Sequence, residues 1–92
     1  MDELQQVHIH YSGKVQGIGF RQTVRSFSKE LGLTGWVKNL KDGRVEIIAE
    51  GEPAKLDRLQ KLLKEQFEIY IVHADVRIQK AQGKFQEFSV VS

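Results

Sequence analysis

Apolar and polar positions alternate with a strand period near the start of the chain and then change to a helix period. Val7, Ile9 and Tyr11 alternate with polar neighbours, which is the pattern of a half-buried strand. Over residues 20–31 the apolar positions recur every three or four residues, which predicts a helix of about three turns. Gly32 follows, and glycine readily adopts the left-handed conformation at a helix C-terminus.

The next stretch has the pattern of a β-hairpin. Residues 34–40 and 44–49 are rich in strand-forming residues, and Asp42-Gly43 lies between them. An Asp-Gly pair favours the tight turns that join antiparallel strands. We therefore expect Asp42 to act as a turn residue rather than as a catalytic acid.

A second helix is predicted after Pro53, because proline fits the first turn of a helix. Its apolar stripe consists of Leu56, Leu59, Leu63 and Phe67. The stretch 69–78 then predicts a strand, whose covered side we expect to carry Val72, Ala74, Val76 and Ile78. After a turn at Gly83, a last strand is expected to direct Phe88 and Val90 inward.

The predicted order of elements is β-α-β-β-α-β, which is the ferredoxin-like split βαβ arrangement. We expect an α+β fold with a four- to five-stranded antiparallel sheet and two helices on one face, because each helix has a single apolar stripe. The final run is either a fifth edge strand or part of the fourth. The length of 92 residues, with 40% hydrophobic and 28% charged residues, predicts one folded domain over residues 1–92.

The composition excludes several kinds of site. The chain contains no cysteine, so disulfides, thiolate metal sites and a cysteine nucleophile are ruled out. No apolar run approaches the roughly 20 residues that span a bilayer, and the acidic start Met1-Asp2-Glu3 does not resemble a secretory signal. We therefore expect a soluble, cytoplasmic protein without a membrane partner.

Positive charge is concentrated in the first half of the chain. The net charge is only +2, but residues 14–44 carry seven basic and two acidic side chains and so have a net charge of +5. A local positive field attracts small anions. A solvated basic face gives the same pattern, and charge alone leaves both interpretations open.

The segment that joins the first strand to the first helix has the features of an anion-binding loop. Residues 13–21 contain three glycines and end at Arg21. Glycines let the backbone present successive N–H groups at a helix N-terminus, and an arginine can bind two phosphate oxygens at once. The segment lacks the dinucleotide-binding and Walker patterns. An ordinary glycine-containing turn with a surface arginine is the alternative.

Two motifs together resemble the acylphosphatase family. The first is Gly13-x-Val15-Gln16-Gly17-Ile18-Gly19-Phe20-Arg21, and the second is Gly35-Trp36-Val37-Lys38-Asn39-Leu40, followed by Asp42-Gly43-Arg44-Val45. The terminal Gly83-x-Phe85-x-x-Phe88-x-Val90 resembles the usual last strand of that family. Ile18 replaces the common valine, and residues 65–73 lack the Gly/Pro-containing loop of many relatives.

The resemblance implies hydrolysis of the carboxyl-phosphate bond of a small-molecule acyl phosphate by a monomer without cofactor or metal. Arg21 and the loop backbone would hold the phosphoryl group, and Asn39 would position the attacking water. The substrate-binding loop would consist of Lys14, Val15, Gln16, Gly17, Ile18, Gly19 and Phe20. The alternative is a noncatalytic module that binds acyl phosphates or carbamoyl phosphate.

Two histidines outside these motifs raise other possibilities. His8 and His10 share one face of the first strand, but no third histidine or carboxylate lies near them in sequence. We therefore interpret them as exposed residues of a sheet face rather than as a metal site. The same order of elements also builds RNA-recognition domains, which need exposed aromatic residues on the central strands. The corresponding positions are His8, His10, Glu46, Ile48 and Glu50, so we expect no nucleic-acid partner.

Overall fold

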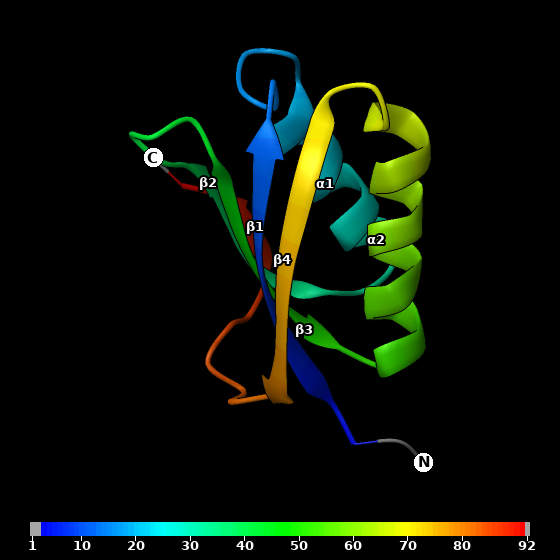
Figure 1. Ribbon diagram of the computed structural model, residues 1–92. Helices are drawn as coiled ribbons and strands as arrows, with labels where there is room; N and C mark the ends of the chain where they lie inside the picture. Colours follow the sequence, from blue (N-terminus) through cyan, green and yellow to red (C-terminus); the bar gives the residue numbers. More distant parts are fainter. Residues whose placement is uncertain (1–2, 92) are drawn as a thin grey trace.

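The computed structural model describes residues 3–91, so the predicted acidic start lies outside the described residues except for Glu3. In this part of the chain, five strands and two helices follow one another (Figure 1). Their bounds are β1 Gln5–Gly13, α1 Phe20–Glu30, β2 Thr34–Asn39, β3 Val45–Gly51, α2 Pro53–Phe67, β4 Ile71–Lys80 and β5 Phe88–Val90. The predicted ferredoxin-like order is confirmed.

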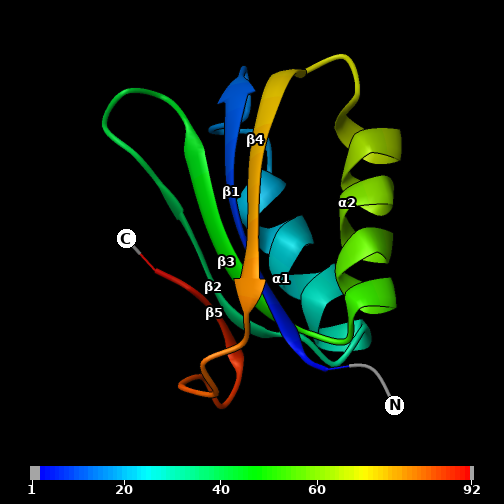
Figure 2. The same ribbon diagram turned by 60° about the horizontal axis from the view of Figure 1, so that its bottom comes forward.

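All five strands belong to one sheet in the order β4-β1-β3-β2-β5. The first four pair antiparallel, as predicted. The final run is a separate edge strand, and it pairs parallel to β2 through Gly35↔Phe88 and Val37↔Val90. The sheet is therefore mixed rather than wholly antiparallel. The segment between β4 and β5 must cross from one edge of the sheet to the other (Figure 2).

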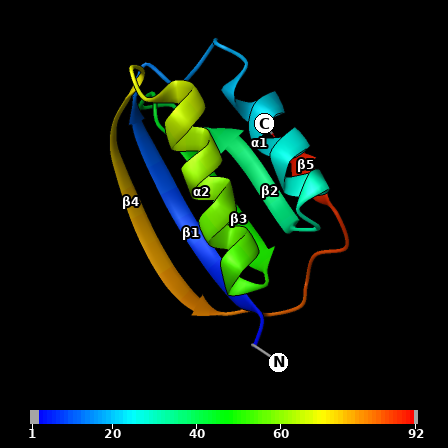
Figure 3. The same ribbon diagram turned by 90° about the vertical axis from the view of Figure 1, so that its right-hand side faces the viewer.

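Both helices cover the same face of the sheet (Figure 3). Their apolar stripes meet the inward-facing residues of the strands, and among residues 3–91 sixteen hydrophobic residues are buried. Three aromatic rings join the layers at one end, because Phe20 packs edge-on against Tyr11 at 5.3 Å and against Phe67 at 4.8 Å between ring centroids. Such pairs add stability beyond the apolar area that they bury.

The covered side of β4 differs from the prediction. The register of β4 against β1 shifts between Ser12 and Gly13. This irregularity brings Ile71 onto the core and leaves Val72, predicted to be covered, 82% exposed. Ile78 lies on the predicted face but is 63% exposed, because β4 is an edge strand that extends beyond the helices (Figure 3). The strand also spans 71–80 rather than 69–78.

The other face of the sheet is covered by neither α1 nor α2, and its polar residues alternate with the core residues of each strand. On β1 these are Gln6, His8 and His10, and they pair with β3 positions Glu50, Ile48 and Glu46. Within residues 3–91, neither helix is long and apolar enough to cross a membrane.

Candidate active site

The loop between β1 and α1 begins at a close backbone contact. Gly13 has φ +125°, and a Cβ atom there would overlap the carbonyl oxygen of Tyr70 and lie 2.8 Å from the Val72 nitrogen. The next residue donates its backbone N–H to that same carbonyl, with Lys14 N to Tyr70 O at 2.9 Å. The start of the loop is therefore fixed to the connection between α2 and β4, and only glycine fits there.

The rest of the loop presents backbone donors without acceptors. Within residues 3–91, none of the N–H groups of residues 15–19 donates to a backbone or side-chain acceptor. Gly19 caps α1 in the left-handed conformation, with φ 82°, and the first turn of α1 contains no acidic residue. Free N–H groups and the positive end of the helix dipole favour an anion at this position.

Arg21 is positioned by the residue before it. Phe20 is only 1% exposed and lies between Tyr11 and Phe67, so the start of α1 is anchored in the core. Arg21 is half-buried, and no carboxylate within residues 3–91 comes within 4.0 Å of its guanidinium. Together with the loop it lines a small hollow of about 60 Å³. Its guanidinium is therefore free to bind an external anion.

Asn39 is the last residue of β2. Its side chain lies on the helix-covered face of the sheet, because it alternates with Lys38 and shares the face of buried Val37. Its carbonyl oxygen Oδ1 is buried and has no hydrogen-bond partner among residues 3–91. A buried acceptor without a partner costs free energy, so such an atom points to a missing partner such as a water molecule or a ligand.

Gln16 connects the loop to the strand that carries Asn39. Its side-chain amide donates to Leu40 O at 2.8 Å and to Arg44 O at 3.0 Å. These carbonyls flank the turn between β2 and β3, which lies at the same end of the sheet as the loop (Figure 1). The fold therefore brings the two predicted motifs together.

The turn itself is stabilised by Asp42, as predicted. Its carboxylate accepts the backbone N–H of Arg44 at 3.1 Å and the Nε–H of the same residue at 2.9 Å. The backbone hydrogen bond from Arg44 is the main cause that holds the pKa of Asp42 below its usual value, with the guanidinium adding to it. An ionised, exposed carboxylate engaged in its own turn is a structural group.

Not all predicted loop residues can contact a ligand through their side chains. Val15 is 1% exposed and belongs to the core, and Phe20 is equally buried. Ile18, by contrast, is 36% exposed at the rim of the loop. Val15 and Phe20 can therefore contribute to binding only through their backbone and by fixing the shape of the loop.

Larger hollows lie elsewhere and lack the chemistry of the loop. One of about 470 Å³ lies between α2 and β4 and includes Tyr11 and His73. Burial raises the pKa of Tyr11 to about 12, so its hydroxyl stays neutral and is a poor base. A second of about 310 Å³ includes Leu31 and Glu50. Size alone does not identify a site for a small anion, and the loop with Arg21 remains the candidate.

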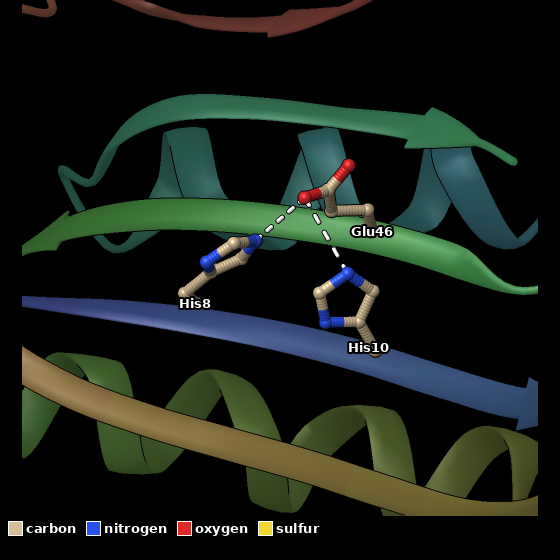
Figure 4. A group of neighbouring side chains, drawn as sticks. All are labelled: His8, His10 and Glu46. Atoms are coloured by element: carbon tan, nitrogen blue, oxygen red, sulfur yellow. Dashed lines mark hydrogen bonds and ion pairs between the residues drawn. The ribbon is translucent and has the colours of Figure 1, made fainter.

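Sequence reasoning missed one cluster, on the open face of the sheet. His8 and His10 meet Glu46 of β3, with the Nε2 atoms 2.6 Å and 3.4 Å from Glu46 Oε2 (Figure 4). No carboxylate lies near the two histidines in the sequence, but the fold brings Glu46 beside both of them. Pairing of β1 with β3 places Glu46 directly opposite His10. A prediction of that strand register would have revealed the cluster.

Comparison with known proteins agrees with the two motifs. The acylphosphatase family model matches residues 7–90. The chain is 39% identical to the acylphosphatase of Methylococcus capsulatus over 96% of this chain and 97% of that protein. The crystal structure of acylphosphatase from Bacillus subtilis has a TM-score of 0.88 and 33% identity, covering 96% of this chain and 99% of that one.

A longer protein also contains this fold. The crystal structure of full-length HypF in the phosphate- and nucleotide-bound form matches with a TM-score of 0.86 and 25% identity, and the match covers the whole of this chain but 12% of that protein. The family model and the full-length relatives agree on the family of this chain. The chain belongs to the acylphosphatase family, whose members are hydrolases that act on acyl phosphates.

Proposed function

We propose that this protein hydrolyses the carboxyl-phosphate bond of acyl phosphates at the loop formed by residues 13–21. The phosphoryl group would accept hydrogen bonds from the free N–H groups of the loop and from the guanidinium of Arg21. Asn39 would hold the attacking water. The observation that carries the proposal is the buried Asn39 Oδ1, which has no hydrogen-bond partner within residues 3–91 and lies at the end of the sheet where Gln16 joins the loop to the hairpin.

The reaction requires few side chains. The water oxygen attacks phosphorus, the bond from phosphorus to the acyl oxygen breaks, and the acyl group leaves as a carboxylate. The proton of the water passes to a phosphate oxygen of the substrate. Asn39 cannot take it, because an amide does not accept a proton near neutral pH. Positioning and charge stabilisation are the main contributions that a protein makes to phosphoryl transfer.

Two substitutions test these roles. In Arg21→Ala and Asn39→Ala, we expect phosphate release from benzoyl phosphate to fall by about 100-fold or more, as when one preorganised donor is removed elsewhere. Lys29→Ala, near the other end of α1, is the matched control and should keep full activity. Unchanged activity in both site variants, with the fold intact by circular dichroism, would refute the assignment.

A second candidate is a noncatalytic module that binds acyl phosphates or carbamoyl phosphate. It rests on the likeness to a part of HypF, a longer protein whose crystal structure is of a phosphate- and nucleotide-bound form. It predicts that inorganic phosphate binds to the wild type but not to Arg21→Ala, while no acyl phosphate is turned over. In either case we propose a cytoplasmic monomer that acts on a small molecule. We propose no nucleic-acid partner, because β1 and β3 carry no pair of exposed aromatic residues.

A further inference from the structure

Three side chains with metal-binding atoms meet on the open face of the sheet. His8 and His10 lie two residues apart on β1, and Glu46 lies opposite His10 on β3. One ligand atom from each of the three lies within 4.8 Å of the others. The histidine rings are 4.8 Å apart between centroids and tilted by 41°, and both Nε2 atoms are directed at the same carboxylate (Figure 4).

We propose that His8, His10 and Glu46 form a binding site for one zinc-like divalent transition-metal ion. Zinc binds histidine nitrogen and carboxylate oxygen at about 2.0–2.2 Å, which places the ligand atoms of a tetrahedral site roughly 3.3 Å apart. His10 Nε2 and Glu46 Oε2 already lie 3.4 Å apart. The 2.6 Å contact of His8 with Glu46 needs to open by less than about 1 Å, within the range of small side-chain rotations.

The backbone holds the three ligands in place before an ion arrives. All three lie inside paired strands rather than on loops, and rigid elements make more precise ligand sets than loops do. The side chains are 34%, 21% and 15% exposed for His8, His10 and Glu46. They are therefore partly shielded but open to solvent on one side, from which water can fill the fourth position.

The positive charges next to the cluster are paired with carboxylates, so they do not exclude a bound cation. Lys38 approaches the other carboxylate oxygen of Glu46, Oε1, at 3.8 Å, so Oε2 stays directed at the histidines. Arg77 lies opposite His8 on β4, and its charge is balanced by Asp75, which lies opposite His10. Two imidazoles with one carboxylate suit zinc, nickel or copper, whereas magnesium and calcium prefer sets of oxygen ligands.

The proposed metal site does not depend on the proposed hydrolysis. His8, His10 and Glu46 lie on the open face, whereas Asn39 lies on the helix-covered face. We therefore expect the metal to act as a clamp between β1 and β3 and to raise the melting temperature in proportion to the logarithm of its concentration. Removing it with EDTA should leave phosphate release unchanged.

The proposal is tested by titrating zinc into the chain without a histidine tag and measuring the heat of binding by isothermal titration calorimetry. We expect one zinc ion to bind, while magnesium gives no heat. His8→Asn, His10→Asn and Glu46→Gln should each weaken zinc binding at least about 10- to 100-fold, because loss of even an outer-shell partner has that effect. His73→Asn is the matched control, since His73 is exposed on β4 and outside the cluster, and it should bind zinc as the wild type does.

A second readout needs no variant. Zinc should shift the ring resonances of His8 and His10 in nuclear magnetic resonance spectra of the wild type and leave those of His73 in place. The proposal is overturned if the wild type binds no zinc up to about 1 mM, if His73→Asn loses binding, or if only the His73 ring responds.

Discussion

At the scale of single residues, the loop owes its shape to side chains that pack into the core or bond to the neighbouring hairpin. Val15 and Phe20 are buried in the core. They fix the two ends of the segment whose N–H groups, at residues 15–19, have no acceptor among residues 3–91. Gln16 holds the loop from the outside through two carbonyls of the hairpin. We therefore propose Gln16 as a residue that positions the loop, and with it Arg21, relative to Asn39.

Gln16→Met removes the two donors while keeping a side chain of similar length. Each carbonyl also accepts a backbone N–H, Gly43 N to Leu40 O and Leu40 N to Arg44 O, so the loss of stability should be only about 1 kcal/mol. The loop, however, is released from the strand that carries Asn39. We expect kcat/KM for benzoyl phosphate to fall about 10- to 100-fold, because small misplacements of reacting groups lower the rate by this much.

The control is Gln60→Met on α2, whose amide donates a weak hydrogen bond to Leu56 O of its own helix, at 3.5 Å. It should change neither activity nor the melting temperature by a measurable amount. If Gln16→Met lost stability in urea unfolding but kept full kcat/KM, the tether would be structural only.

At the scale of elements, what the sequence predicts depends on how local the signal is. Both helices, the hairpin and the turn at Asp42 follow from periodicity and turn chemistry, which act over a few residues, and all are confirmed. The pairing of β5 was not predictable in the same way, because parallel pairing with β2 is a contact between distant segments. Val72 was misplaced because a one-residue shift at Ser12/Gly13 reverses which side chains face the core.

The candidate site follows the same rule. The two motifs predict Arg21 and Asn39 by resemblance, and Gln16 joins them in a way that the motifs alone do not state. The cluster of His8, His10 and Glu46 has no local signal, because its members are brought together only by strand register. Sites on adjacent strands become visible once the pairing is known.

Ser28 on α1 gives a prediction about the stability of an element. It is fully buried, and its hydroxyl has no hydrogen-bond partner among residues 3–91. A buried polar group without a partner costs about 1–3 kcal/mol, and alanine favours a helix by up to about 0.5 kcal/mol more than serine. We therefore expect Ser28→Ala to raise the free energy of unfolding by about 1 kcal/mol.

Urea unfolding of Ser28→Ala beside Ser26→Ala measures this effect. Ser26 is exposed on the same helix, so its replacement reports helix propensity alone and should gain at most about 0.5 kcal/mol. A Ser28→Ala variant less stable than the wild type would mean that the hydroxyl has a partner in solution.

At the scale of the whole molecule, Glu50 fastens the segment that crosses from β4 to β5. Glu50 is 4% exposed, and its carboxylate accepts the backbone N–H groups of Gln82 at 2.8 Å and Gly83 at 3.0 Å. It also accepts the side-chain amide of Gln6 at 2.7 Å, and Gln6 in turn accepts that of Gln79. One carboxylate thus connects β3, β1 and β4 to the crossing segment, and so helps to set where β5 joins the sheet.

The protonation of Glu50 should therefore be visible in the stability of the fold. Burial by itself raises the pKa of Glu50, but the hydrogen bonds from Gln82, Gln6 and Gly83 outweigh it and hold that pKa below its usual value. The unfolded chain then binds the proton more readily than the folded one. The stability that Glu50 contributes is complete above the unfolded pKa of about 4.3, and it is lost as the pH falls through the lower pKa of the folded state.

Glu50→Gln tests this linkage by urea unfolding at pH 7 and pH 3. At pH 7 the variant should lose about 1.5–3 kcal/mol, the range for hydrogen bonds to a charged group, because one carboxylate oxygen becomes an NH₂ that faces donors. At pH 3 the difference from the wild type should shrink, since the carboxyl of the unfolded chain is then mostly protonated and the contribution of the ionised Glu50 to stability is reduced. Glu87→Gln, an exposed carboxylate in the same segment, is the control and should change little at either pH. A destabilisation of Glu50→Gln that is equal at both pH values would place the role of Glu50 in packing rather than in its charge.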